Sequence, residues 1–561
     1  MSRLRIAHLA GPTATIQNTP PLVTSNKARA RAGLPPRAAA GGGTLAQDAL
    51  RAQRLAAPAT VWVEQFSAHP LEADAADLYG PPDGWMDGQG KVQDAPGPGL
   101  KPVYRIELDP EDGLYPLPYM ALQADGSPWE EECTAPGAAS ARQGFFPDGS
   151  RSFEEIDRLS IGMDGLASLI SSRAAVEFYR VAPPGGWRKG RAEAERTDIG
   201  EGDIPPETLG QNFFAYKPHH LAKSPPRPLL AKITNEVQAV MSSGKYDGAI
   251  WTQGSPQVEE SAYWFNLLID TPLPIACNAA QRPQGQISND GPANIVDSVT
   301  YIESGIWKDA AGANRLGTVV IQEQQFFAAR EVAKVDARPG GYVATGGHGG
   351  VLGQITHLGR AHVTYVPAYR HTFRSEVRLP LLPAEVAVTV LEAGKVAVKT
   401  LTIKDAEGRL LPEAIPSVSI VKDGGYAAEE FGDDPEAEAD LGFQIMRKLA
   451  SGRLGGFVVE GLVPYGSPTS ELRGRMLREA SLSGLPVVRV GRGYPEGFAD
   501  PDFWSIAGLN LTATKARLLL MACLMKFGAL PVAADPKAPT EAELAAFRAA
   551  LDRYQDVFDT H

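Results

Sequence analysis

Short apolar runs alternate with longer amphipathic segments between residues 226 and 322. The runs have the length and content of buried strands, whereas the longer segments have the spacing of helices. The predicted strands are 245–252, 273–278 and 316–322, and the predicted helices are 229–243, 256–269 and 290–303. This alternation predicts parallel strands with helices on both faces of the sheet.

A second series of the same kind begins near residue 443. Its predicted strands are 455–460 and 486–490, and its predicted helices are 443–449, 470–483 and 513–527. An apolar run at 5–10 predicts an N-terminal strand, which ends where Gly11 and Pro12 follow it. The predicted fold class is therefore α/β, with two domains built of parallel sheets flanked by helices.

Two stretches interrupt this pattern. Proline, glycine and acidic residues accumulate between about 79 and 220 (GPPDGWMDGQG, DAPGPG), which indicates a large insertion. A strand is predicted at 58–66, and short β-like pieces bounded by prolines occupy 372–426. We therefore expect an N-terminal domain over 1–370 with an insertion at about 79–220, a linker and insertion over 371–440, and a C-terminal domain over 441–561.

The amino-acid composition limits the classes of binding partner that we expect. Glycine and proline supply 58 and 46 of the 561 residues, which indicates many loops and turns. Lysine and arginine number 54 against 66 aspartates and glutamates, so the net charge is −12. An acidic chain disfavours nucleic acid or an anionic membrane as the main partner.

Cysteine usage and apolar run length bear on the compartment. Cys133, Cys277 and Cys523 lie far apart and show no metal-ligand spacing, which argues against a disulfide framework. The apolar stretch at the N-terminus is too short for a signal peptide. The longest apolar run, 518–525, is far shorter than the roughly 20 residues that span a bilayer. We therefore expect a soluble, cytoplasmic protein without a membrane segment.

Several motifs in order resemble a known family. The segment 246–268 (YDGAIWTQGSPQVEESAYWFNLL) resembles the central region of bacterial L-asparaginases and glutaminases, as do the downstream segments GLPVVRVGRG and GLNLTATKARLLLMACL. The similarity extends over roughly 245–360 and 443–530 and leaves the insertions uncovered. It implies the two-domain asparaginase architecture, hydrolysis of carbon–nitrogen bonds other than peptide bonds, no metal or organic cofactor, and assembly into a homodimer or homotetramer.

The resemblance implies a threonine nucleophile after the first strand, where the family has TGGTI. Residues 9–16 read LAGPTATI, so Thr15 matches the threonine–isoleucine pair and Thr13 matches the spacing after the glycine. A hydroxyl needs a base and an ordered acceptor for the carbonyl oxygen in order to attack. The alternative is that these threonines only satisfy backbone groups in a turn.

The family's second catalytic motif, HGTDT, corresponds to residues 253–257, QGSPQ. Ser255 replaces the family threonine and keeps the hydroxyl, and Lys334 matches the family lysine. A lysine beside a hydroxyl or a water can serve as the base. Alternatively, Lys334 is a surface lysine at a strand end.

Pro256 is the main departure from the family pattern. The family has an aspartate here, which binds the substrate's α-ammonium group, and proline offers neither charge nor donor. An ammonium buried without its carboxylate costs several kcal/mol, so we expect a free α-amino acid to bind poorly. The substrate-binding candidates Gln253, Gly254, Pro256 and Gln257 are all neutral, which suits an amide, lactam, imide or ureide. Two alternatives stay open: a non-catalytic small-molecule-binding or assembly protein, and a true asparaginase or glutaminase whose ammonium site lies in the insertion.

Three further sites match weakly or not at all. Ser67 is a candidate for the family serine that binds the substrate carboxylate, and Glu496 for the glutamate that a neighbouring subunit contributes. Asp290 precedes a predicted helix and is expected to cap it. The histidines His219, His220 and His348 show no metal-ligand spacing with acidic residues, so no metal is expected.

Overall fold

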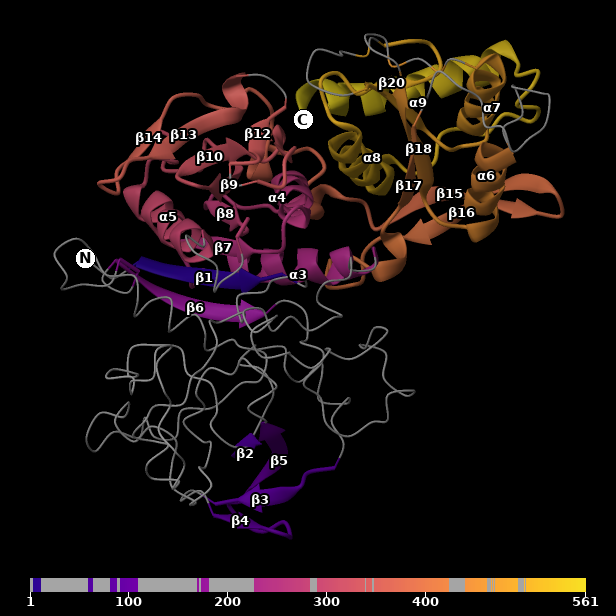
Figure 1. Ribbon diagram of the computed structural model, residues 1–561. Helices are drawn as coiled ribbons and strands as arrows, with labels where there is room; N and C mark the ends of the chain where they lie inside the picture. Colours follow the sequence, from indigo (N-terminus) through magenta and orange to yellow (C-terminus); the bar gives the residue numbers. More distant parts are fainter. Residues whose placement is uncertain are drawn as a thin grey trace, which may run out of the picture. The chain divides into compact units, whose positions relative to one another are not determined.

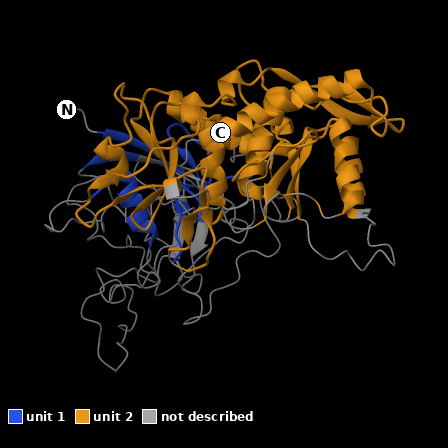
Figure 2. Cartoon of the chain, turned by 90° about the horizontal axis from the view of Figure 1, so that it is seen from above, with its two compact units in different colours: residues 1–225, 250–254, 278–299 blue, residues 226–249, 255–277, 300–561 orange. Residues whose placement is uncertain are grey.

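The structure is a computed structural model. It describes residues 4–11, 59–63, 81–87, 91–108, 169–170, 173–180, 227–282, 290–338, 340–345, 348–422, 439–461, 466, 468, 470–492, 499 and 501–561. The chain divides into two compact units, shown in Figure 2. Unit 1 comprises Met1–Pro225, Ile250–Gly254 and Asn278–Val299, and unit 2 comprises Pro226–Ala249, Ser255–Cys277 and Thr300–His561.

The elements predicted between 226 and 322 are all present, with shifts of a few residues at their ends. They are α3 (Leu229–Ser242), β7 (Gly248–Thr252), α4 (Gln257–Leu268), β8 (Ile275–Asn278), α5 (Gly291–Ser304) and β9 (Thr318–Gln322). The three strands are buried along nearly their whole length, as their continuous apolar sequences require. Helix α4 is buried on most sides because Ala262, Tyr263, Trp264 and Phe265 follow one another.

In unit 2 the sheet is mixed, with the strand order β14-β13-β10-β9-β8-β7. Its further strands are β10 (Gln325–Ala328), β13 (Val351–Ile355) and β14 (Ala361–Val363). The pairs β9/β10, β10/β13 and β13/β14 are antiparallel. Glu323 and Gln324 join β9 to β10 with φ of 47° and 65°. A two-residue turn with positive φ at both positions forms a tight hairpin, so the sheet is not parallel throughout.

In unit 1 the order continues as β7-β1-β6. Strand β1 (Leu4–Ala10) pairs in parallel with β6 (Ala174–Arg180), with Leu4 opposite Ala174. Strand β6 therefore places part of the stretch 79–220 in the central sheet. Four other strands form a separate antiparallel sheet with the order β2-β5-β3-β4. They are β2 (Ala59–Val63), β3 (Gly84–Met86), β4 (Val92–Gln93) and β5 (Lys101–Leu108).

The C-terminal part of unit 2 carries a parallel sheet with the order β17-β18-β19-β20. Its elements are β17 (Ser417–Lys422), α6 (Ala439–Ser451), β18 (Gly455–Gly461), α7 (Glu471–Leu482), β19 (Val487–Gly491), β20 (Ile506–Ala507), α8 (Ala513–Phe527) and α9 (Glu541–Thr560). Two hairpins precede it: β11 (Val332–Lys334) with β12 (Tyr342–Ala344), and β15 (Glu385–Glu392) with β16 (Lys395–Thr402). Short 3₁₀ turns are η6 (His348–Gly350), η7 (Thr372–Arg374), η8 (Leu379–Leu381) and η9 (Pro412–Ala414).

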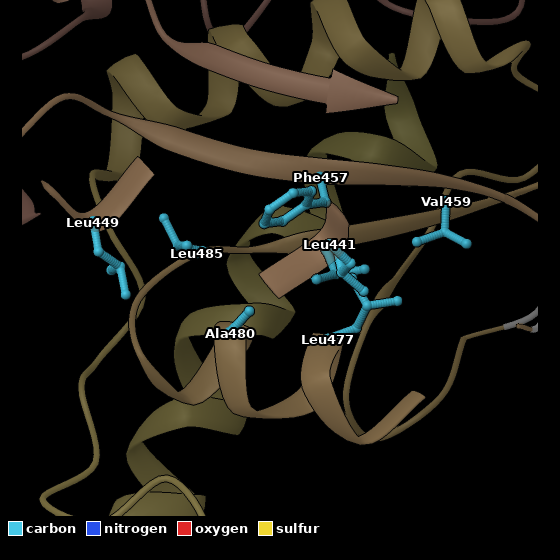
Figure 3. Packing of buried hydrophobic residues seen from close by; sticks show 8 residues of the cluster. Leu441, Leu449, Phe457, Val459, Leu477, Ala480 and Leu485 are labelled. Carbon is cyan, nitrogen blue, oxygen red and sulfur yellow. The ribbon is translucent and has the colours of Figure 1, made fainter. Parts of the chain in front are cut away.

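Alternate residues of β18 face opposite layers of helices (Figure 1). Phe457 and Val459 pack into a core formed with α6, α7 and β19 (Figure 3). A Cβ on Gly456, on the opposite face, would lie 3.2 Å from Leu520 of α8. The buried members of the core are Leu441, Leu449, Phe457, Val459, Leu477, Ala480, Leu485 and Val487. The predicted α/β class, with helices on both faces of a parallel sheet, is therefore confirmed.

Candidate active site

The structure describes some of the predicted site residues and not others. Thr13, Thr15, Ser67 and Glu496 lie outside the described residues. The segment 253–257, which we call the QGSPQ segment, connects β7 to α4. Its first two residues belong to unit 1 and the rest, with Lys334, to unit 2, so each group is described within its own unit.

In unit 1, Gln253 is held in the interior. Its side chain is 3% exposed, and its Oε1 accepts a hydrogen bond of 3.0 Å from Trp251 Nε1. Gly11 lies against the same two side chains and donates its N–H to the carbonyl of Thr252 at 2.8 Å. A Cβ on Gly11 would approach the Trp251 ring to 2.7 Å and Gln253 Cβ to 3.2 Å. Only glycine fits at position 11. This residue directly precedes the segment that carries the predicted nucleophiles Thr13 and Thr15.

Four side chains join the ends of β1, β7 and β8 to α5, and we call them the polar network: His8, Thr252, Asn278 and Ser298. His8 Nε2 lies 2.7 Å from Thr252 Oγ1, which donates to Asn278 Oδ1 at 2.8 Å. Asn278 Nδ2 donates to Ser298 Oγ at 3.1 Å. Because the threonine proton goes to Asn278, His8 must donate from Nε2.

Burial lowers the pKa of His8 to about 3, so the ring is neutral at neutral pH. The polar network therefore fixes the strand ends without carrying a charge. Sequence reasoning missed His8. The available signal was one histidine within the apolar run 5–10, although a buried polar residue there does not disclose its partners.

Asp290 lies directly before α5, where a helix cap was predicted. Its backbone carbonyl accepts from the N–H of Asn294 at 2.9 Å, which starts the helix. Its carboxylate accepts from the backbone N–H groups of Gln281 and Arg282 at 2.8–3.0 Å. Asp290 therefore also holds the turn that follows β8.

In unit 2, Tyr342 connects two of the predicted residues. Its hydroxyl donates to Ser255 Oγ at 2.7 Å, and its backbone pairs directly with Lys334 across the β11/β12 hairpin. Side chains of directly paired residues lie on the same face of a sheet. The structure thus brings Ser255 and Lys334 together through Tyr342, which the sequence analysis did not identify.

The other members of the QGSPQ segment lie at the start of α4. Pro256 occupies the N-cap position and is exposed, and its carbonyl accepts from the N–H of Glu259 at 3.1 Å. Gln257 is the first helical residue and is half-buried. Proline suits this end of a helix, where a missing N–H costs nothing. It places no hydrogen-bonding side chain where the family aspartate stands.

Three ionisable residues, Glu259, Lys334 and Lys515, form what we call the charged cluster. Glu259 Oε2 accepts from the backbone N–H of Lys334 at 2.5 Å. Lys515 is fully buried, and its Nζ donates to the carbonyls of Glu259 at 2.6 Å and Ala329 at 2.8 Å. Burial lowers the pKa of Lys515 to about 8 and raises the pKa of Glu259, although the opposite charges oppose both shifts. Desolvation therefore outweighs the attraction between the two.

Other chemistry receives little support from the described part of the chain. No group of three or more histidine, cysteine, aspartate or glutamate side chains there is placed to hold a metal ion. Cys277 and Cys523 are buried, and burial raises the pKa of both thiols, so neither is a thiolate at neutral pH. In the same residues, no helix combines the length and apolarity needed to cross a membrane.

Comparison with known proteins finds similar sequences. The sequence profile described as Asparaginase, N-terminal matches residues 227–355. A glutaminase-asparaginase of Acinetobacter glutaminasificans is 26% identical over 306 residues, covering 53% of this chain and 76% of the relative. An L-asparaginase of Bacillus licheniformis is 35% identical over 108 residues, covering 19% and 32%. L-asparaginase 2 of Escherichia coli K12 is 33% identical over 130 residues, covering 23% and 34%.

Among solved structures, the probable cytoplasmic L-asparaginase of Campylobacter jejuni is matched over 70% of this chain and 93% of its own, with 18% identity and a TM-score of 0.44. The profile and the curated relatives define the class, that of asparaginase-type hydrolases, which act on carbon–nitrogen bonds other than peptide bonds. Residues 227–355 therefore match the asparaginase family profile, and the chain is similar to bacterial L-asparaginases and glutaminase-asparaginases.

Proposed function

We propose that this chain hydrolyses a carbon–nitrogen bond in a small amide, lactam, imide or related molecule that lacks a free α-ammonium group. The observation that carries the proposal is Pro256, exposed at the N-cap of α4 between Ser255 and Gln257. An α-ammonium group requires a carboxylate at this point, and a neutral amide does not. The family relationship supports the reaction, and the proline supports the substrate class.

The role of each residue is assigned by following the bonds that form and break during hydrolysis. The hydroxyl of Thr15 or Thr13 attacks the carbonyl carbon, and its proton passes to Lys334. Lys334 then returns the proton to the departing nitrogen as the C–N bond breaks. Water hydrolyses the acyl-threonine ester, which releases a carboxylate and restores the hydroxyl. Ser255, oriented by Tyr342, donates a hydrogen bond to the substrate or the water.

Glu259 is the next carboxylate along the chain after Pro256, and its surroundings favour a structural role. Its Oε2 accepts from the Lys334 backbone, and burial raises its pKa. A carboxylate already used in this way is a poor substitute for the family aspartate. We further propose that the enzyme acts in the cytoplasm as a homodimer or homotetramer, as the family resemblance implies.

A substrate screen tests the proposal. Purified protein is offered asparagine, glutamine, simple amides, lactams, imides and hydantoins, with detection of ammonia and of new carboxylate. We expect turnover of at least one neutral compound and a kcat/KM for asparagine lower by orders of magnitude. Asparagine as the best substrate would contradict the substrate class.

Threonine variants test the mechanism separately. Thr15→Ala and Thr13→Ala are compared singly and together on the compound that the screen identifies. One single variant should lose nearly all turnover, while the other serves as its matched control. Full turnover by the double variant would exclude the threonine mechanism. Thermal stabilisation by a compound that is never hydrolysed would favour a binding protein.

A further inference from the structure

A cavity of about 620 Å³ lies in unit 2, between Arg227 near the start of α3, the strand β17 and the helix α6. Four cationic side chains line it: Arg227, Arg447, Lys448 and Arg453. The other lining residues that the structure describes are three serines and one glutamine, and none of these described residues is acidic. This is a local excess of positive charge in a chain whose net charge is −12.

Two of these cations, Lys448 and Arg227, donate hydrogen bonds to backbone carbonyls. Lys448 is buried, and its Nζ donates to the carbonyl of Ser417 at 2.6 Å. Arg227 donates from Nη1 to the carbonyl of Pro416 at 3.0 Å. Arg447 and Arg453 are exposed. An ammonium has three donors and a guanidinium five, so these contacts use only part of the donors present.

The cations also repel one another. Burial, followed by the charges of Arg227 and Arg447, lowers the pKa of Lys448 to about 8. Burial likewise lowers the pKa of Arg227, with contributions from Arg517 and Arg453. Holding like charges around one cavity raises the free energy of the folded chain, and an anion between them would remove that cost.

We propose that this cavity binds a small polyanion through phosphate or carboxylate groups. Guanidinium groups bind both kinds of oxyanion with paired hydrogen bonds, and the Ser417 and Ser419 side chains supply hydroxyls at the cavity wall. The volume lies within the range of small-molecule sites. The cavity shares no residue with the QGSPQ segment or the charged cluster, so the proposal is independent of the proposed reaction.

Isothermal titration calorimetry on the full chain tests the site, with inorganic pyrophosphate and citrate as probes at constant ionic strength. We expect at least one probe to bind with a Kd below about 1 mM. Tighter binding of pyrophosphate assigns phosphate as the recognised group, and tighter binding of citrate assigns carboxylate. Binding of neither overturns the proposal.

Variants of the two exposed arginines test whether the anion binds in this cavity. Arg447→Ala and Arg453→Ala should each weaken it about tenfold or more, because each removes a charge-assisted contact. Arg360→Ala is the matched control, since Arg360 is also exposed but lies in the turn between β13 and β14. Melting curves check that the variants are folded. Unchanged binding in both cavity variants, or an equal loss in the control, would place the anion elsewhere and refute the site.

Discussion

The polar network of unit 1 and the charged cluster of unit 2 are both buried or half-buried. Each lies next to the part of the QGSPQ segment in its own unit, yet the two are built from different chemistry. The network is neutral: each hydrogen bond joins a side-chain donor to an acceptor, and His8 is held uncharged. The charged cluster buries Lys515 and most of Glu259 at a cost in solvation. A neutral hydrogen-bonded network fixes the positions of its side chains without the solvation cost of a buried charge. Ionisable groups with perturbed pKa values, in contrast, are concentrated at functional sites.

The largest expected effect tests whether the charged cluster has a chemical role. Lys334→Met removes the proposed base but keeps the backbone N–H that binds Glu259. We expect turnover to fall by about 10²- to 10⁴-fold with little change in the melting temperature. The measurement is kcat on the compound that the screen identifies.

Lys395→Met is the matched control, because Lys395 is an exposed lysine at one end of a hairpin strand, as Lys334 is at the end of β11. It should retain full activity. Equal activity in Lys334→Met and the control would assign Lys334 to the surface and remove the charged cluster from the mechanism.

The second prediction tests the neutrality of the polar network. The pKa of His8 is about 3 in the folded chain and 6.5 unfolded, so below pH 6.5 the unfolded state binds more protons. Stability is therefore fully present above pH 6.5 and is lost as the pH falls towards 3. Linkage gives a loss of about 2 kcal/mol between pH 7 and pH 5 from this group alone.

His8→Gln removes that contribution while offering an uncharged donor and acceptor. Urea unfolding at pH 7, 6 and 5 should show a steeper loss in the wild type, with the difference reaching about 2 kcal/mol at pH 5. His371 and His561, whose pKa values burial lowers to about 4, are present in both proteins and cancel. Parallel curves would mean that His8 is protonated in the folded chain.

The sequence predicted the elements of the sheet cores well, because continuous apolar runs bounded by turns leave few alternatives. Helix α8 lies at the predicted residues, and β7 and α4 differ from prediction only at their ends. Helix α9 was not predicted, although Thr540 and Glu543 form a capping box at its start. Helix α9 contains many charged residues, so the spacing of the apolar residues that face the core is hard to recognise in its sequence.

Strand β6 was missed for another reason. Its partner is β1, which lies more than 160 residues earlier, so the pairing has no local signature. The site shows the same limit. Ser255 and Lys334 were identified because motifs carry them, whereas Tyr342 becomes visible only when the β11/β12 register places it opposite Lys334. Contacts between distant segments arise from folding and are not encoded in any single motif.

The third prediction refines the link between Ser255 and Lys334. Tyr342→Phe deletes the hydrogen bond to Ser255 Oγ and preserves the ring. Loss of one such bond is worth roughly 1 kcal/mol, so we expect kcat to fall about tenfold or less. Tyr365→Phe, at an exposed tyrosine, is the control. A loss as large as that of Lys334→Met would instead make Tyr342 a direct participant in proton transfer.

The smallest effect concerns the buried cation of the charged cluster. The pKa of Lys515 is about 8 in the folded chain against 10.5 unfolded, so between these values the unfolded state binds more protons. The unfolding free energy of the wild type should therefore rise with pH in this window, as the cost of burying the charge is relieved. Integrating the linkage relation from pH 8 to pH 9 gives a rise of about 1 kcal/mol in the unfolding free energy.

The variant Lys515→Met lacks this contribution, and Lys448, also with a pKa of about 8, is common to both proteins. Urea unfolding of both proteins at pH 7, 8 and 9 measures the difference. If the two curves stay parallel, Lys515 keeps its proton through this range, and its attraction to Glu259 outweighs the desolvation that distinguishes the charged cluster from the polar network.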